Sequence, residues 1–249
     1  DPKIFIKHYY EAGADEIIYH DVVASLYGRN QLKELVSRTA NDIFLPLTIG
    51  GGISSIETIQ DMLNSGADRI FANTAFIKNP NLINETVKYF GSSTIVASTE
   101  TIRRDNNYYC NIDFGREATE LKLDEWLDEI QDRGVGEIIV TSIDKDGTGG
   151  GFDLKLADKI SKKIQIPYII NGGFGKLIHF DEVLNCCQPS GIAIGSLLHY
   201  GLKNKTTVSF NGEGNKDFIL KKKKYFNFGE ITLKEIKEHL KNKAEIRII

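Results

Sequence analysis

The sequence has few of the features that disulfide-stabilised, membrane-spanning or nucleic-acid-binding proteins need. Its three cysteines, Cys110, Cys186 and Cys187, are too few and too unevenly placed for a disulfide framework. No apolar run approaches the ~20 residues that cross a bilayer. The 31 basic and 34 acidic residues give a net charge of −3, without the basic excess of a nucleic-acid-binding protein. We therefore expect a cytoplasmic protein with neither a membrane nor a nucleic-acid partner.

The histidines and the overall composition exclude further classes. The five histidines show no metal-ligand spacing, such as two histidines four residues apart on a helix, so no metal site is predicted. Of the 249 residues, 41% are apolar and 26% are charged, which excludes collagen-like, disordered and coiled-coil proteins. A globular protein is left.

Short apolar runs rich in Ile and Val alternate with helical patterns along most of the chain. The runs are continuously apolar, which is typical of parallel strands buried on both faces. Strands are expected at Glu16–Tyr19, Pro46–Ile49, Arg69–Ala72, Thr94–Ala97, Glu137–Thr141, Tyr168–Ile170 and Gly191–Ile194. Helices are expected at Gln31–Ala40, Ile56–Asn64, Leu82–Phe90, Leu123–Asp132, Leu154–Lys163, His179–Leu184 and Leu233–Asn242. This order predicts an α/β fold with a parallel sheet inside a layer of helices.

A closed (β/α)8 barrel has eight strands, one more than the seven expected here. The eighth would have to precede Asp1, so we expect one (β/α)8 TIM-barrel domain over residues 1–249 with its first strand absent from this chain. Two polar segments interrupt the pattern. Arg103–Gly115 is expected to form a hairpin inserted after a strand, and residues 203–229 an insertion before the last helix. The lysine run within the insertion, Lys221–Lys224, is either a solvated loop face or a site for an acidic partner.

The chain also repeats itself at an offset of about 121 residues. Glu16-Ile17-Ile18 recurs as Glu137-Ile138-Ile139, the Pro46 and Gly50-Gly51-Gly52 pattern recurs as Pro167 and Asn171-Gly172-Gly173, and Asn73-Thr74 recurs as Gly195-Ser196. Three recurrences at one spacing indicate duplicated half-barrels.

Each half places a glycine cluster after one strand and a polar pair after the next. These residues are Gly51, Gly52, Asn73 and Thr74 in the first half and Gly172, Gly173, Gly195 and Ser196 in the second. Glycine turns let backbone N–H groups approach a phosphate closely, and a helix N-terminus favours an anion. A single glycine turn is also typical of a tight strand–helix connection. Because the pairing occurs twice, we predict two phosphate sites across one barrel mouth, and hence a substrate with a phosphate at each end.

Two acidic residues lie near these predicted sites. Asp146 and Gly147 follow the strand Glu137–Thr141; they form either a simple Asp-Gly turn or a loop that orders substrate at the second phosphate site. Glu100 follows the strand Thr94–Ala97 and points towards the mouth, either as a general acid–base group or as an ion-pair partner of a neighbouring arginine, Arg103 or Arg104.

The repeat places the counterpart of Glu100 about 21 positions before Asp1. Acid–base chemistry commonly divides its two roles between two carboxylates in different environments. If the counterpart is an acid, this chain lacks half of the pair, and we expect little activity from it.

With these motifs in place, the chain resembles the family of cyclase subunits of imidazole glycerol phosphate synthase, from histidine biosynthesis. The resemblance runs from Asp1 to about Tyr200 and returns in the last helix. The motifs that carry it are GADEIIYHDVVAS (Gly13–Ser25), PLTIGGGI (Pro46–Ile53), GADRIFANTA (Gly66–Ala75), GEIIVTSIDKDGT (Gly136–Thr148) and NGGFGK (Asn171–Lys176).

The resemblance implies a (β/α)8 barrel that receives ammonia through its core from a glutaminase partner. Such an enzyme is a lyase that closes an imidazole ring on a bis-phosphorylated ribulosyl-formimino substrate and releases an aminoimidazole carboxamide ribotide. It uses no metal or organic cofactor. Carried over by position, one phosphate would meet Gly52, Asn73 and Thr74, and the other Asp146, Gly147, Gly173, Gly195 and Ser196. Glu16, Arg69 and Glu137 match a charged ring that admits ammonia, or else form ordinary ion pairs between strands.

The chain departs from the family pattern at three places. The strand with the first catalytic Asp is absent, the second catalytic Asp is matched by Glu100, and residues 203–229 have no counterpart. Compared with Asp, the side chain of Glu100 is longer by one carbon–carbon bond, which displaces its carboxylate by roughly 1.5 Å. Ser25–Asn30 and Glu100 are more similar to a branch that amidates a surface-polysaccharide sugar. Ammonia channelling for sugar amidation is therefore one alternative function, and non-catalytic activation of a glutaminase is another.

Overall fold

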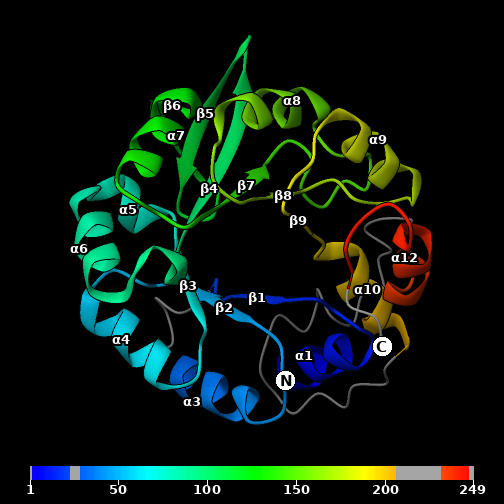
Figure 1. The fold of residues 1–249 in the computed structure, drawn as a ribbon, viewed down its shortest axis with the longest axis horizontal. Helices are drawn as coiled ribbons and strands as arrows, with labels where there is room; N and C mark the ends of the chain where they lie inside the picture. The colour runs from blue at the N-terminus through cyan, green and yellow to red at the C-terminus, as the bar shows by residue number, and fades with distance from the viewer. Residues whose placement is uncertain (1, 23–28, 206–230, 247–249) are drawn as a thin grey trace.

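The computed structural model describes residues 2–22, 29–205 and 231–246, and one nine-stranded sheet forms its framework. Seven parallel strands follow one another along the sheet: β1 (Ile17–His20), β2 (Leu47–Gly50), β3 (Arg69–Ala72), β4 (Ile95–Arg104), β7 (Glu137–Ser142), β8 (Tyr168–Asn171) and β9 (Gly191–Ala193). These strands curl around a central space (Figure 1). The seven predicted strands are confirmed, although the fourth continues to Arg104, well beyond its expected end.

Helices surround the sheet. They are α1 (Pro2–Glu11), α3 (Arg29–Ala40), α4 (Ile56–Asn64), α5 (Thr74–Lys78), α6 (Asn81–Phe90), α7 (Leu123–Asp132), α8 (Leu154–Lys163), α9 (Ile178–Cys186), α10 (Ser196–Lys205) and α12 (Leu233–Leu240), with a 3-10 turn, η1, at Ser92–Thr94. No helix in the described parts of the chain is both long and apolar enough to cross a membrane. The predicted insertion overlaps the end of α10 and otherwise lies outside the described residues, as do residues 23–28, which include most of the Ser25–Asn30 loop.

The sheet is open between β1 and β9. These strands are the two ends of the hydrogen-bonded path, and among the described strands each pairs on one side only. In Figure 1 a gap separates them, with α1, α10 and α12 near it. The architecture is a (β/α)8-type barrel with seven parallel strands in place, as the alternation of strands and helices predicted.

The two halves of the barrel have equivalent pairing registers. Ile17 pairs with Leu47 in the first half, and Ile138 pairs with Tyr168 in the second, where both residues lie 121 positions further along the chain. The pairing of β2 with β3 matches that of β8 with β9: Thr48 pairs with Arg69 and Ile169 with Gly191, at offsets of 121 and 122 positions. The repeat seen in the sequence is therefore also a repeat of backbone pairing, which confirms the duplicated half-barrels.

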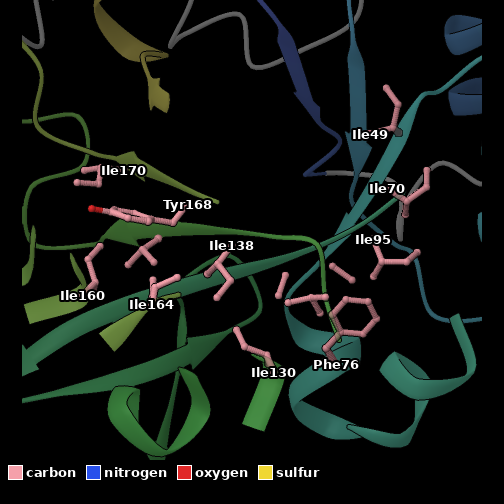
Figure 2. Close-up of a cluster of buried hydrophobic side chains, with 14 of the residues drawn as sticks. Ile49, Ile70, Phe76, Ile95, Ile130, Ile138, Ile160, Ile164, Tyr168 and Ile170 are labelled. Carbon is pink, nitrogen blue, oxygen red and sulfur yellow. The ribbon is translucent and has the colours of Figure 1, made fainter. Parts of the chain in front are cut away.

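Successive strand residues face opposite sides of the sheet, so the barrel has an outer and an inner apolar layer. Ile49, Ile70 and Phe76 belong to the outer layer, between strands and helices (Figure 2). Phe71, next to Ile70 in β3, instead lies in a smaller cluster with Ile139 inside the barrel. Full burial of such a side chain contributes about 1.5–3 kcal/mol. The outer layer therefore holds the helices in place and leaves the inner layer to shape the lumen.

A three-stranded antiparallel extension rises from the barrel at β4. The second half of β4 pairs with β5 (Asn107–Ile112), which pairs with β6 (Glu117–Lys122). Figure 1 shows these strands projecting away from the ring. The predicted hairpin is confirmed, and β6 is an addition that its polar sequence did not indicate. The returning strand places Asn111 opposite Glu100, so the end of the hairpin lies at the barrel mouth.

Candidate functional site at the barrel mouth

Both predicted phosphate sites lie on one rim of the barrel. Gly51 and Gly52 follow β2, and Asn73 follows the neighbouring β3. In the second half the glycine cluster follows β8, and its polar partners follow the neighbouring β9. All seven strands are parallel, so their carboxyl ends meet at the same rim. The two glycine turns therefore open towards one mouth.

The second predicted site is assembled from three loops. Gly195 and Ser196 lie at the start of α10, whose Ser196 hydroxyl faces the loop after β7. A Cβ atom added to Gly147 of that loop would lie 3.8 Å from Ser196 Oγ. A Cβ atom added to Gly172 would lie 3.4 Å from the backbone nitrogen of Asp146. The structure thus brings together the residues that the sequence assigned to this site.

Gly173 completes the second site and requires glycine. Its φ of 109° lies in the left-handed region, and an added Cβ atom would lie 2.2 Å from the carbonyl oxygen of Gly151. His179 supports the same turn, because its Nδ1 accepts hydrogen bonds of 3.2 Å from the backbone of Gly175 and Lys176. Burial lowers the pKa of His179, which favours the neutral ring that can accept these bonds.

The glycines of the first predicted site also allow a close backbone approach. Gly51 has a φ of 106°, and an added Cβ atom would lie 2.1 Å from the carbonyl oxygen of Asp21. Gly52 follows with a φ of 63°. A side chain at Gly51 would push apart the loops after β1 and β2, so this turn depends on glycine.

The polar residues of the first site contact the hairpin. Asn73 Nδ2 donates to the carbonyl oxygen of Asn111 at 2.9 Å, and Thr74 Oγ1 accepts from the backbone nitrogen of Asp113 at 2.9 Å. No equivalent hairpin follows the second site in the described chain, so the two sites differ in their surroundings. The first is bordered by the turn that ends β5.

Glu100 lies in β4, beside the first site. It is opposite Thr141 of β7 on one side and Asn111 of β5 on the other. Asn73 Nδ2 donates to Glu100 Oε2 at 2.9 Å. Arg104 instead pairs with Glu120 at 3.0 Å, and Arg103 donates from its backbone to Asp144. The geometry favours the acid–base alternative for Glu100 over the ion pair.

The surroundings of Glu100 favour its protonated form. Burial raises the pKa of its carboxyl group above the ordinary value, and the nearby charges of Asp146 and Asp113 add to this effect. Hydrogen bonds from Asn73 and from the backbone of Gly115 act in the opposite direction. A carboxyl group with a raised pKa exchanges protons more readily near neutral pH, as a general acid–base group requires.

A cavity of about 1000 Å³ takes in the barrel interior and the open side between β1 and β9, where α1, α10 and α12 line it. Glu100, Asp146 and Ser196 line it at the mouth, Phe71 lines its middle, and Glu16 lines its far end. This volume is large enough for a small-molecule ligand.

A charged cluster lies at the amino ends of the strands. Arg69 Nη1 lies 2.8 Å from Glu137 Oε2 and 3.5 Å from Glu16 Oε1, and Thr48 donates to Glu16 Oε1 at 2.8 Å. Burial raises the pKa of Glu137, and the charge of Arg69 opposes this shift. The three predicted ring residues are thus in contact, at the end of the barrel opposite the mouth.

Sequence reasoning missed the residues that the hairpin brings to the mouth. Asn111 and Asp113 contact the first site, and the Phe114 ring centroid lies 5.0 Å from that of His20. His20 in turn lies 5.0 Å from the ring of Phe71, and burial lowers its pKa. The polar hairpin at a strand end was the available signal, but it does not reveal which residues fold back over the mouth.

Comparison with known proteins gives consistent relatives. A family model described as "Histidine biosynthesis protein" matches residues 1–204. Three relatives are each named "Imidazole glycerol phosphate synthase subunit HisF". The relative from Legionella pneumophila is 45% identical over 73% of this chain and 86% of its own, and the one from Bacillus cereus (strain G9842) is 39% identical over 81% and 80%. The relative from Campylobacter concisus (strain 13826) is 36% identical over 100% of this chain and 87% of its own.

The family model covers well over half of the chain, and each of these relatives exceeds 30% identity over more than two thirds of its length. Together with the duplicated barrel and the paired glycine turns, these similarities show that the chain belongs to the histidine biosynthesis protein family.

Proposed function

We propose that this protein is the cyclase subunit of an imidazole glycerol phosphate synthase. It would close an imidazole ring on a bis-phosphorylated ribulosyl-formimino substrate and release an aminoimidazole carboxamide ribotide. The observation that carries this proposal is the position of Glu100 on the same rim as two glycine-rich turns, above a cavity that reaches Glu16. The names of the relatives support the same activity.

The two turns would bind the two phosphates of the substrate. At the second site, the backbone of Gly147 approaches the start of α10, where Gly195 leaves open space and Ser196 adds a hydroxyl. N–H groups at a helix N-terminus and in glycine turns stabilise a doubly charged phosphate. At the first site, Gly52 and its neighbours would bind the other phosphate beside the hairpin.

Glu100 would move protons while the ring closes. Formation of the imidazole requires nitrogen to lose protons and an oxygen leaving group to gain one, and a carboxyl group with a raised pKa can serve both needs. Asn73 and the backbone of Gly115 orient the carboxyl group of Glu100, which lines the cavity. Orientation of this kind matters because misplacement by ~1 Å can cost about a hundredfold in rate.

Ammonia would enter at the opposite end of the barrel. A glutaminase partner would bind against the amino ends of the strands, next to the cluster of Glu16, Arg69 and Glu137. Movement of the Arg69 side chain away from Glu137 would open the way into the cavity. The alternative for the cluster is a permanent set of ion pairs between strands, in which case ammonia reaches the cavity elsewhere.

Turnover of the ribulosyl-formimino substrate with ammonium salts, in the absence of any glutaminase and by a protein that includes the strand expected before Asp1, tests the proposal. We expect release of the ribotide product and its loss in Glu100→Gln, which keeps the size of the side chain but cannot ionise. Glu117→Gln is the control, because Glu117 is exposed on β6. Failure to turn over, together with failure to restore growth of a histidine auxotroph, would contradict the proposal and favour sugar amidation or glutaminase activation.

A further inference from the structure

We propose that Asn111 is a positioning residue that holds two hydrogen-bond donors against the carboxylate of Glu100. The inference rests on the proposed role of Glu100, because it concerns how that residue is prepared for proton transfer. Asn111 acts from behind the mouth, through Asn73 and through the turn that follows β5, and does not itself touch the substrate.

Asn111 fixes the orientation of the Asn73 amide. It is 4% exposed and lies directly opposite Glu100 in the antiparallel pairing of β4 with β5. The amide nitrogen of Asn73 has two hydrogens, and it donates to the Glu100 carboxylate and to the carbonyl oxygen of Asn111, each at 2.9 Å. Because both hydrogens have an acceptor, the Asn73 amide has one preferred orientation.

The side chain of Asn111 also closes the turn after β5. Its Nδ2 donates to the carbonyl oxygen of Gly115 at 2.9 Å. Asp113, Phe114 and Gly115 have φ values of 50°, 58° and 75°, a run of left-handed residues of which only the last is glycine. Such a backbone is costly for non-glycine residues and persists only where surrounding contacts determine it. The bond from Asn111 spans this turn and is one of those contacts.

Two further contacts hold the turn against the rest of the barrel. Thr74 Oγ1 accepts from the backbone nitrogen of Asp113, and the ring of Phe114 lies against His20 of β1. These contacts place the turn over the mouth, whereas the bond from Asn111 fixes the peptide of Gly115. The backbone of Gly115 then donates towards Glu100. Loss of the Asn111 donor would therefore disturb this one peptide more than the position of the whole turn.

The groups around Glu100 determine the direction of the effect. Asp146, from the loop after β7, and Asp113, from the turn, both raise the pKa of Glu100, as does burial. Arg116 pairs with Asp113 at 3.1 Å on the outer side of the turn. The donors from Asn73 and Gly115 are what oppose these influences. Loss of the Asn111 side chain leaves its main-chain carbonyl as the acceptor for Asn73, so weaker donation from Gly115 must raise the pKa of Glu100 further.

The experiment compares Asn111→Leu, which keeps similar volume without a donor, with Asn107→Ala, an exposed change on the same strand. The titration of the Glu100 carboxyl is followed by ¹³C NMR, and the pH profile of kcat is measured in parallel. We expect Asn111→Leu to raise the pKa of Glu100 by about one unit and to lower kcat about tenfold, with KM within about twofold. Asn107→Ala should change none of these quantities.

An unchanged Glu100 pKa in folded Asn111→Leu would overturn the inference. If that variant fails to fold, the wild-type protein provides the test. The chemical shift of the Gly115 amide should change with pH at the same midpoint as the Glu100 carboxyl group. A Gly115 amide whose chemical shift does not change at that midpoint would also overturn the inference. Neither NMR measurement needs turnover. A wild-type protein without cyclase activity but with the expected titrations would thus contradict the proposed function and support the positioning role.

Discussion

Asn73, directly after β3, and Glu100, within the adjacent strand β4, are joined by a hydrogen bond of 2.9 Å. Asn73 belongs to the first predicted phosphate site, and Glu100 is the predicted acid–base group. A single amide therefore contacts the proposed catalytic carboxylate from the place where a substrate phosphate is expected. Substrate binding at the first site would alter the hydrogen bonding of the group that performs the chemistry.

Because of this contact, substitution of Asn73 should lower activity more than the loss of a phosphate contact alone would. In Asn73→Ala, the donor that lowers the Glu100 pKa is lost, so that pKa should rise. A hydrogen bond to a charged group is worth about 1.5–3 kcal/mol, so kcat/KM should fall about 10- to 100-fold. Steady-state kinetics with ammonium would measure the change. Asn79→Ala, an exposed site at the end of α5, is the control and should leave kcat/KM unchanged.

Removal of the Glu100 charge should stabilise the protein while it removes activity. The folded-state pKa of Glu100 is raised, so its contribution to stability is present at low pH and is lost as pH rises through that pKa. Glu100→Gln avoids this loss. Its Tm should equal that of wild type near pH 4 and exceed it at pH 7–8, by about 3–5 °C for each unit of pKa shift.

Thermal unfolding of both proteins at a series of pH values measures this difference. Glu117→Gln, with its exposed side chain, should follow wild type throughout. A Glu100→Gln protein that is less stable than wild type at pH 8 would mean that the carboxylate is stabilised in the folded state, and it would contradict the raised pKa.

The sequence predicted the barrel because its signals are local and repeated. Short apolar runs such as Glu137–Thr141, alternating with helical patterns, are typical of strands buried on both faces. The offset between Pro46 and Pro167 is preserved in the strand register. The glycine turns were predictable for the same reason. The role of Asn111 was not predictable from the sequence. Its contact with Asn73 joins residues 38 positions apart, and it depends on how the hairpin folds back, which no sequence periodicity specifies.

The second glycine turn offers a direct test of the phosphate sites. In Gly173→Ala, the new Cβ atom would lie 2.2 Å from the backbone of Gly151, so the turn must move. We expect at least a tenfold weaker affinity for inorganic phosphate at this site by calorimetry. Gly91→Ala is a matched control, since Gly91 also has a positive φ, 82°, but has open space around its Cα. Wild-type protein that binds no phosphate at millimolar concentration would contradict the assignment.

Arg69 distinguishes the two interpretations of the charged cluster. In Arg69→Met, Glu16 and Glu137 lose their shared cation. If the cluster controls ammonia entry, glutamine-dependent turnover with the partner glutaminase should fall at least tenfold, while turnover with ammonium stays within about threefold. If the cluster is only structural, both activities should fall together with Tm. Arg38→Met, which removes an exposed ion pair with Glu34 on α3, is the control.

His179 should make the second phosphate site sensitive to acid. Its Nδ1 accepts two backbone hydrogen bonds from the turn after β8, and protonation of that nitrogen would remove both. The folded-state pKa of His179 is lowered by burial, so the unfolded chain binds the proton at a higher pH. Stability from this group is therefore complete above about pH 6.5 and is lost as pH falls below that value.

His179→Asn separates this effect from general acid sensitivity. The Asn side-chain oxygen can accept from the same backbone groups but does not titrate. Between pH 7.5 and 5, Tm should fall less in His179→Asn than in wild type, whereas His8→Gln, an exposed change on α1, should reproduce the wild-type slope. Phosphate affinity should show the same pattern, because the turn that His179 supports carries Gly173. Equal slopes in all three proteins would mean that His179 does not titrate with folding and that its bonds to the turn survive acid.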